Sequence, residues 1–216
     1  MINRRTMTTT VTKVVCFGLL AMCLNLSQVI AAGFQDKSES PESQQLASWI
    51  IDSGDNGKMP FVIVDKKNAK VSVFDAGGRL RGAAPALLGL THGDDIVPGI
   101  GTRRLSTIRS NERITPSGRF IAALGHTLNG QEVLWVDYDA GIAMHRVVTS
   151  NPKERRAQRL ASPTAADKRI SYGCINIPVK FYEDVVSPAF RETDGIVYVL
   201  PETRSGEIEF FAQYGH

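Results

Sequence analysis

Cysteine is scarce in this chain: it occurs three times in 216 residues, as Cys16, Cys23 and Cys174. The first two lie in an N-terminal segment with the features of a signal peptide. If that segment is removed, Cys174 is the only thiol of the mature chain and no internal disulfide can form. A single unpaired cysteine is unusual in an oxidising compartment. Cys174 is therefore either buried and inert, or retained because the protein needs a thiolate.

Long hydrophobic runs are also missing. The apolar run at residues 14–26 is about a dozen residues, shorter than the roughly 20 that a membrane-spanning helix needs. It follows three basic residues and leads to small residues at positions 31 and 32, which predicts a secretory signal peptide over residues 1–32. An uncleaved anchor is the alternative. Lipidation is not expected, because Met22 precedes Cys23 where a small residue is required. We expect an exported protein of the periplasm or cell envelope, with no stable membrane span after signal removal.

An excess of positive charge is absent once the signal is set aside. The formal charge of +3 equals the contribution of Arg4, Arg5 and Lys13, and without them 22 basic residues face 22 acidic ones. No basic patch interleaved with aromatic residues occurs either. The composition therefore gives no support for a nucleic-acid partner.

The mature sequence predicts one mostly β domain with short helices. Residues 33–57 read as a polar linker with a short helix at 43–51, residues 58–202 as a catalytic domain, and residues 203–216 as a tail. Strands are expected at 61–65, 70–75, 82–89, 119–124, 132–137, 140–148 and 195–200. A charged helix at 153–160 is expected to be a solvated face, and Pro178 is expected to start a helix over 179–186.

Cys174 lies between Gly173 and a β-branched residue, shortly before Pro178. This pattern indicates a thiol displayed at a strand-to-helix corner, as a nucleophile would be, although a buried structural cysteine is the commoner case. A cysteine nucleophile needs a base, usually histidine. Among four histidines, His145 lies inside a predicted strand, where it must find a partner or lose hydration. That placement favours His145 as the partner of Cys174.

The other three histidines leave the assignment open. His216 is the last residue of the chain, His92 is expected to be solvated or to brace a long loop, and His126 lies at a strand end beside a hairpin tip. If His92 or His126 approached Cys174 instead, the base assignment would change while the nucleophile stayed the same.

Two motifs resemble the L,D-transpeptidase catalytic domain, also called the YkuD family. Residues 171–176, Ser-Tyr-Gly-Cys-Ile-Asn, are similar to the family signature Ser/Thr-His-Gly-Cys-hydrophobic-Asn/Arg, and residues 115–120, Thr-Pro-Ser-Gly-Arg-Phe, resemble its Thr-Pro-x-Gly-x-Phe turn. The likeness covers residues 61–201 with its parts in the family order. It implies a β-sandwich or barrel-like catalytic domain with one helix after the nucleophile.

The resemblance implies an exported enzyme that acts on peptidoglycan stem peptides, cross-linking or attaching cell-wall components through a cysteine acyl-enzyme. By motif position, Cys174 is the nucleophile and His145 the acid and base. Ser171 and Gly173 then shape the cysteine turn, and the backbone N–H groups of Tyr172, Gly173 and Cys174 supply the oxyanion hole. Asn176 braces the site. No metal and no organic cofactor are expected, and we expect a monomer.

Three departures from the family pattern concern specificity. Tyr172 stands where the family has histidine, and Arg146 follows the strand histidine where Gly or Ser is usual. Residues 149–168 are longer than the usual spacing and are interpreted as a lid or substrate-shaping insertion. Arg146 and Arg169 are candidates for gripping a substrate carboxylate, with solvation on the surface as the alternative for each.

Two competing functions stay open. With water as acceptor the same site is an L,D-carboxypeptidase or hydrolase, because nucleophile, base and oxyanion hole are shared. Tyr172 and Arg146 also leave room for a catalytically silent envelope-binding module of the same fold.

Overall fold

Strands form in all seven predicted segments, but the segment predicted at 82–89 is divided between two strands, and the short strands at 169–171 and 175–177 were not predicted. The computed structural model describes residues 39–204 and Phe211; the predicted signal peptide and His216 lie outside the described residues. The strands are β1 (Phe61–Asp65), β2 (Lys70–Phe74), β3 (Leu80–Pro85), β4 (Leu88–Gly89), β5 (Gly118–His126), β6 (Glu132–Asp137), β7 (Ile142–Arg146), β8 (Arg169–Ser171), β9 (Ile175–Ile177) and β10 (Gly195–Val199). The mostly β fold with short helices is confirmed.

Eight strands make one sheet in the order β3-β2-β1-β10-β5-β6-β7-β9, and β4 pairs with β8. Three pairs are parallel, β1 with β10, β7 with β9 and β4 with β8. Leu87, between β3 and β4, exchanges two backbone hydrogen bonds with Asn176 of β9, at 2.8 and 2.9 Å. This bridge brings the chain after one edge strand to the other edge strand, so the sheet is nearly closed and barrel-like.

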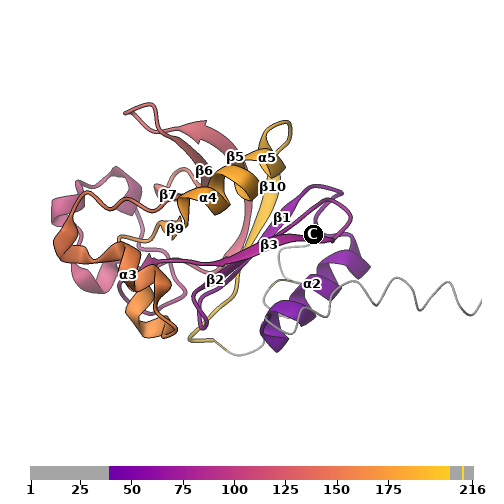
Figure 1. Cartoon of the computed structure of the whole chain (residues 1–216), viewed down its shortest axis with the longest axis horizontal. Coiled ribbons are helices and arrows are strands. Elements are labelled where there is room, and N and C mark those ends of the chain that lie inside the picture. The colour runs from indigo at the N-terminus through magenta and orange to yellow at the C-terminus, as the bar shows by residue number, and fades with distance from the viewer. Residues whose placement is uncertain (1–38, 205–210, 212–216) are drawn as a thin grey trace, which may run out of the picture. The chain divides into compact units, whose positions relative to one another are not determined.

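Helices cover both faces of the strands around β1, and every residue of β1 is buried. On one face, Val62 and Val64 belong to a core cluster that includes Tyr182 and Val186. These two come from a continuous helical stretch, made of α4 (Val179–Phe181), the π-helical η7 (Tyr182–Val186) and α5 (Ser187–Phe190). On the other face lies α2 (Pro41–Ser53) (Figure 1). The predicted helix after Pro178 is therefore present but extends four residues further.

The helix α2 begins and ends at strong capping signals. Ser40 accepts a hydrogen bond from the backbone N–H of Ser43, Pro41 occupies the first turn, and Gly54 ends the helix with φ of 70°. Its buried residues include Leu46 and Ile50. The helix is thus packed against the sheet, and it is longer than the predicted 43–51.

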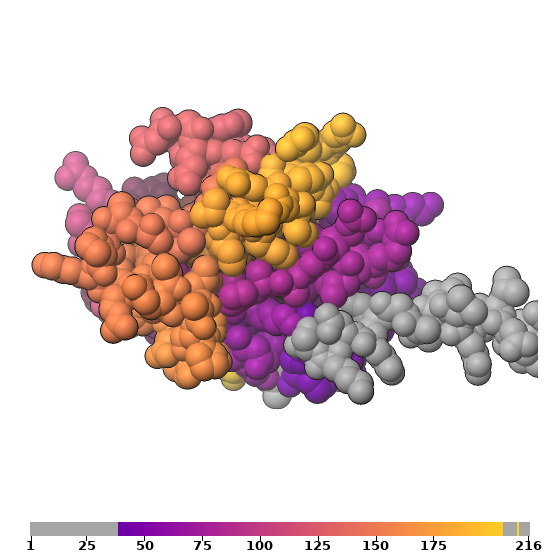
Figure 2. Space-filling model, viewed as in Figure 1, coloured from indigo at the N-terminus to yellow at the C-terminus, as the bar shows by residue number. Residues whose placement is uncertain are grey.

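The segment 149–168 differs from its prediction. A single charged helix was expected, but the chain forms η5 (Pro152–Glu154) and then α3 (Arg156–Ala161), with η6 (Ala165–Lys168) after them. Arg155 separates the first two with φ of 51°, a left-handed conformation that interrupts helical hydrogen bonding. The segment forms part of the surface in Figure 2, in orange.

Three further 3₁₀ turns lie in the long loop between β4 and β5. They are η2 (Ile100–Thr102), η3 (Leu105–Thr107) and η4 (Ser110–Glu112). This is the long loop that contains His92. It leads into the motif at residues 115–120, which begins β5.

Candidate active site

Both predicted catalytic residues, Cys174 and His145, line one cleft of about 360 Å³. The cleft is walled by the cysteine turn, by the end of β7 and by the segment after it. Its remaining lining residues are Leu105, Val148, Ser150, Asn151, Glu154, Arg156, Ser171, Tyr172 and Asn176. The structure thus brings together five of the seven predicted site residues around an open cleft. The other two are Gly173, which lies in the turn itself, and Arg146, whose side chain does not line the cleft.

Cys174 lies in the turn between β8 and β9, not at a strand-to-helix corner as the sequence suggested. The helix begins only at Val179, because the chain first makes the parallel pairing of β9 with β7. Gly173 adopts φ of 130° in this turn, and a Cβ there would lie 2.7 Å from the carbonyl oxygen of Ile114. Only glycine satisfies both the conformation and the space.

The side chain of Ser171 closes the cysteine turn. Its hydroxyl donates to the carbonyl of Cys174 at 2.6 Å and accepts from the N–H of Gly173 at 3.1 Å. The N–H of Gly173 is therefore occupied within the turn. Of the three amides proposed for an oxyanion hole, those of Tyr172 and Cys174 remain candidates.

The thiol of Cys174 is half-buried and donates to the carbonyl oxygen of Gly141 at 3.6 Å. Burial raises its pKa above the ordinary value; the backbone of Ala143 and the positive charge of Arg156 act in the opposite direction. Among the described residues no hydrogen bond joins this thiol to His145. At neutral pH Cys174 is therefore a thiol, not a preformed thiolate.

His145 lies near the end of β7, directly across from Asn176 in the parallel pairing with β9. Its Nδ1 is 2.7 Å from the carbonyl oxygen of Arg146. A carbonyl only accepts, so Nδ1 carries the hydrogen and Nε2 keeps its lone pair in the neutral ring. Burial lowers the pKa of His145 most; the charge of Arg156 lowers it further, and the carbonyl of Arg146 opposes both. The ring is neutral at pH 7 and suited to accept a proton at Nε2.

Asn176 contacts both His145 and Cys174. Its side-chain nitrogen lies 3.3 Å from Nε2 of His145 and 3.3 Å from the carbonyl oxygen of Cys174. Its side-chain oxygen accepts from Arg156 at 2.6 Å. Asn176 is 1% exposed, so the bracing role expected for it agrees with these contacts.

Tyr172, which replaces the motif histidine, has a partner that the sequence did not reveal. The guanidinium of Arg113 stacks over the Tyr172 ring at 3.9 Å from the ring centroid. Such a cation–π contact fixes the ring without requiring a buried hydrogen bond. Tyr172 therefore forms a wall of the cleft.

The two arginines considered for substrate carboxylates contact other groups of the protein. Arg146 lies over the ring of Tyr182 at 4.3 Å and donates to Glu183 at 3.1 Å, and its contribution to the site is its backbone carbonyl. Arg169 is 6% exposed and forms an ion pair with Glu202. The alternative of surface solvation is also wrong for Arg169, because the fold buries its guanidinium.

The other described histidines lie away from Cys174. His92 donates to the carboxylate of Glu202 at 2.7 Å and so braces its loop, and His126 is exposed at the end of β5. Neither lines the cleft. His145 is therefore the described histidine that shares a cleft with Cys174.

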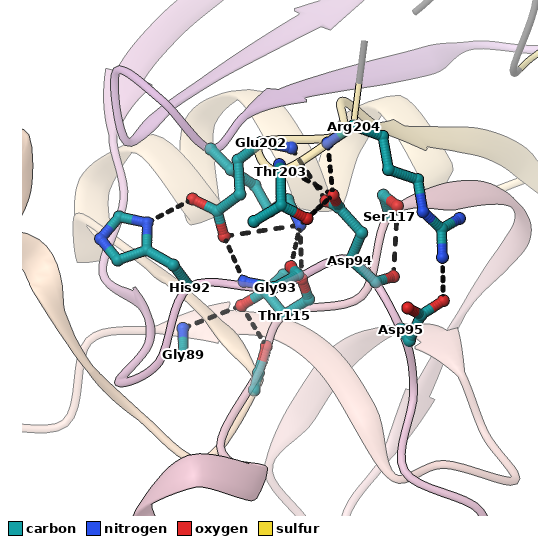
Figure 3. Close-up of polar contacts among 12 residues, drawn as sticks. Gly89, His92, Gly93, Asp94, Asp95, Thr115, Ser117, Glu202, Thr203 and Arg204 are labelled. Carbon is teal, nitrogen blue, oxygen red and sulfur yellow. Dashed lines mark hydrogen bonds and ion pairs between the residues drawn. The ribbon is translucent and has the colours of Figure 1, made fainter.

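A buried cluster of charges lies between the loop that precedes β5 and the chain after β10 (Figure 3). The ammonium of Lys66 donates to the carboxylate of Asp94 at 2.8 Å, and both side chains have 0% exposure. Asp94 also accepts from the backbone N–H groups of Glu202, Thr203 and Arg204, at 2.8, 2.8 and 3.1 Å. These bonds tie the chain after β10 to the loop that precedes β5.

The charges of this cluster shift one another's pKa values. Burial alone would raise the pKa of Asp94, but hydrogen bonds from Lys66, Thr203 and the backbone, with the charge of Lys66, hold it well below its ordinary value. For Glu202, burial is likewise outweighed by the N–H of Gly93 and by Arg169, and its pKa is lowered. Burial lowers the pKa of Lys66 despite its acidic partners.

Thr115 connects this cluster to the cysteine turn. Its hydroxyl donates to the carbonyl of Gly173 and accepts from the N–H of Gly89, both at 2.8 Å, while its own carbonyl accepts from Lys66 at 3.0 Å. All three bonds are buried. The threonine that opens the residue 115–120 motif is therefore a structural support of the turn that carries Cys174.

Sequence reasoning missed Thr115, Lys66 and Arg156. The motif that contains Thr115 was a usable signal, but its hydroxyl was given no role. Nothing in the sequence indicated a role for Arg156, because it lies in a run of charged residues and such runs usually face solvent. Within residues 39–204, no group of three or more His, Cys, Asp or Glu side chains is arranged to hold a metal ion, and no helix is long and apolar enough to cross a membrane.

No protein-family model and no curated protein matches the chain. Among solved structures it is similar to the helical cell shape determining protein Pgp2 from Campylobacter jejuni, at 14% identity and a TM-score of 0.45, over 68% of this chain and 49% of that one. It is also similar to the L,D-transpeptidase LdtMt1 in complex with imipenem, at 16% identity and a TM-score of 0.37, over 65% and 58% of the two chains.

A third similar structure is the catalytic domain of the E. faecium L,D-transpeptidase, at 15% identity and a TM-score of 0.34, over 66% of this chain and 98% of that one. The chain thus aligns with about half of Pgp2 and somewhat more of LdtMt1. At these values the likeness concerns the fold, and the function has to be argued from the site.

Proposed function

We propose that this chain is an exported cysteine acyltransferase that acts on peptidoglycan stem peptides by L,D-transpeptidation. The observation that carries the proposal is the shared cleft of Cys174 and His145, in which Nε2 of the histidine is unprotonated. The motif resemblance at residues 115–120 and 171–176 supplies the substrate class. The signal-like segment at residues 1–32 is the basis for export.

In the first half-reaction the thiol attacks the carbonyl that follows the diamino acid of the donor stem. The thiol leaves the carbonyl of Gly141, and Nε2 of His145, in the same cleft, takes the thiol proton as the S–C bond forms. The carbonyl oxygen becomes an oxyanion, and the free amides of the turn are its proposed donors. As the tetrahedral intermediate collapses, the C–N bond breaks and His145 returns the proton to the leaving D-amino acid.

In the second half-reaction an amine of another stem attacks the thioester. His145 takes a proton from the amine as a new C–N bond forms, and it passes that proton to the departing sulfur as the C–S bond breaks, which restores the thiol and the neutral imidazole. With water in place of the amine, the product is a free carboxylate, and the enzyme is a hydrolase. The neutral thiol and imidazole at pH 7 favour general-base attack over a resting ion pair.

Incubation of the protein with tetrapeptide muropeptides, followed by mass spectrometry, tests the proposal. We expect cross-linked dimers with loss of one D-amino acid, and no product from Cys174→Ala. If the only products are tripeptides, without dimers, the protein is a hydrolase. A Cys174→Ala protein that still forms product, or an acyl adduct with a carbapenem, would contradict the role of Cys174. A folded wild-type protein that yields neither would favour the silent binding module.

A further inference from the structure

Arg156 reaches the candidate site from a segment that the sequence assigned to solvent. Its side chain is 14% exposed. One guanidinium nitrogen donates to the side-chain oxygen of Asn176, and Nε donates to the carboxylate of Glu154. Arg156 and Glu154 both line the cleft with His145. The guanidinium is therefore held on both sides, in a fixed position against the amide of Asn176.

The Arg156 contact determines which way the Asn176 amide points. An amide has one accepting oxygen and one donating nitrogen, and a guanidinium only donates. The oxygen must face Arg156, so the nitrogen faces Nε2 of His145 and the carbonyl of Cys174. With the amide reversed, its oxygen would favour a hydrogen on Nε2. A ring with hydrogen on Nε2 cannot accept the thiol proton there.

The charges around His145 act in the same direction. The ionisable groups that share its cleft come from three parts of the fold: Glu154 (η5), Arg156 (α3), and Tyr172 and Cys174 (the turn between β8 and β9). The guanidinium of Arg146, its neighbour on β7, is engaged with Glu132 and Glu183. The positive charge of Arg156 disfavours a protonated ring and lowers the pKa of His145 beyond the effect of burial.

We propose that Arg156 is a positioning residue: through the side-chain amide of Asn176 it keeps Nε2 of His145 unprotonated, so that this nitrogen can accept the proton of Cys174 when the thiol replaces the Asn176 N–H as its donor. The proposal rests on the proposed nucleophile and base. It gives the segment 149–168 a function, because this segment carries the guanidinium to the site. It does not require Arg156 to touch substrate.

The test uses the full chain with Cys16→Ser and Cys23→Ser, so that Cys174 is the only thiol. In this background Arg156→Gln removes the charge, and Arg155→Gln is the matched control, because it removes the same charge from the adjacent, exposed residue. Histidine NMR reports the tautomer and titration midpoint of His145, and alkylation by iodoacetamide reports the thiolate of Cys174. Neither readout needs a peptidoglycan substrate. Acylation by a carbapenem is measured in parallel.

For Arg156→Gln we expect a higher titration midpoint for His145, some ring with hydrogen on Nε2, and alkylation of Cys174 displaced to higher pH. Carbapenem acylation at pH 6 should fall about tenfold, as for loss of one hydrogen bond to a charged group. Arg155→Gln should match wild type. Equal midpoints and tautomers in the two variants would overturn the proposal.

Arg156→Lys keeps a charge and a donor, and covers the case in which Arg156→Gln does not fold. We expect it to restore the wild-type tautomer and at least half of the lost acylation rate. Loss of acylation as large as in Arg156→Gln, with an unchanged tautomer, would instead indicate a purely structural role. If wild type does not acylate but the His145 midpoint still moves in Arg156→Gln, the positioning role stands and the proposed function fails.

Discussion

The cysteine turn is held from two sides that differ in burial and in chemistry. On the cleft side, Asn176 contacts His145, and Arg156 donates to the side-chain oxygen of Asn176. On the inner side, Thr115 joins the turn to Lys66 and Asp94, whose side chains have no exposure. We infer that the inner side fixes where the turn lies, whereas the cleft side, under the proposed function, sets the protonation of Cys174 and His145.

The largest effect is expected on the cleft side. His145→Gln removes the proposed base and should slow carbapenem acylation by about 10²–10⁴-fold, while the free energy of unfolding changes by less than about 1 kcal/mol. Mass spectrometry measures the rate and urea denaturation the stability. His126→Gln, at an exposed strand end, is the control and should retain the wild-type acylation rate and stability. Full acylation by His145→Gln would remove His145 from the chemistry.

On the inner side, Lys66→Met should act on stability. It leaves Asp94 and Glu202 buried without their ammonium partner, which costs about 3–5 kcal/mol of unfolding free energy. Urea denaturation measures this loss, with the exposed Lys153→Met as control. A variant as stable as wild type would mean that the buried cluster does not hold the turn region together.

Thr115→Val tests the junction between the two sides. It keeps the side-chain shape but leaves the N–H of Gly89 and the carbonyl of Gly173 unpaired, at a cost of about 1–3 kcal/mol. Because the turn then shifts, acylation should slow by about tenfold to a hundredfold. Thr115→Ser retains the hydroxyl and should recover most of the lost stability and most of the lost acylation rate. Thr102→Val, in an exposed 3₁₀ turn, serves as control. If Thr115→Val is destabilised but its acylation rate is unchanged, the inner side contributes to stability without affecting the chemistry on the cleft side.

The smallest effect is expected when the pH is lowered, and it concerns the stability of the inner side. Folding lowers the pKa of Asp94 and Glu202, so the stabilisation is present above their unfolded values of about 4 and is lost as the pH falls toward the folded values. Thermal melts from pH 7 to pH 3 should show a falling midpoint. Asp139→Asn, at an exposed position, should give the same curve. A midpoint that does not fall would contradict the lowered values.

Much of the fold was predictable because it depends on local patterns. The alternation of β-branched residues placed β1, β2, β5, β6 and β10, and Pro178 marked the helix start. The prediction failed for residues 153–160, where Arg155 breaks the helix, and for the corner at Cys174. Both depend on contacts with distant residues: parallel pairing with β7 holds β9 after the cysteine turn, and Asn176 binds the first guanidinium of α3.

The sequence alone determined the lone thiol outside the signal-like segment, the order of the two motifs and the histidine inside a strand, because these are properties of residue identity and spacing. Only the tertiary structure decided what each polar group faces. Arg169 was predicted for substrate or solvent and is buried against Glu202, whereas Arg156 was assigned to solvent and contacts Asn176. An arginine's role depends on the acceptor within reach of its guanidinium, and chain folding, not neighbouring sequence, brings that acceptor close.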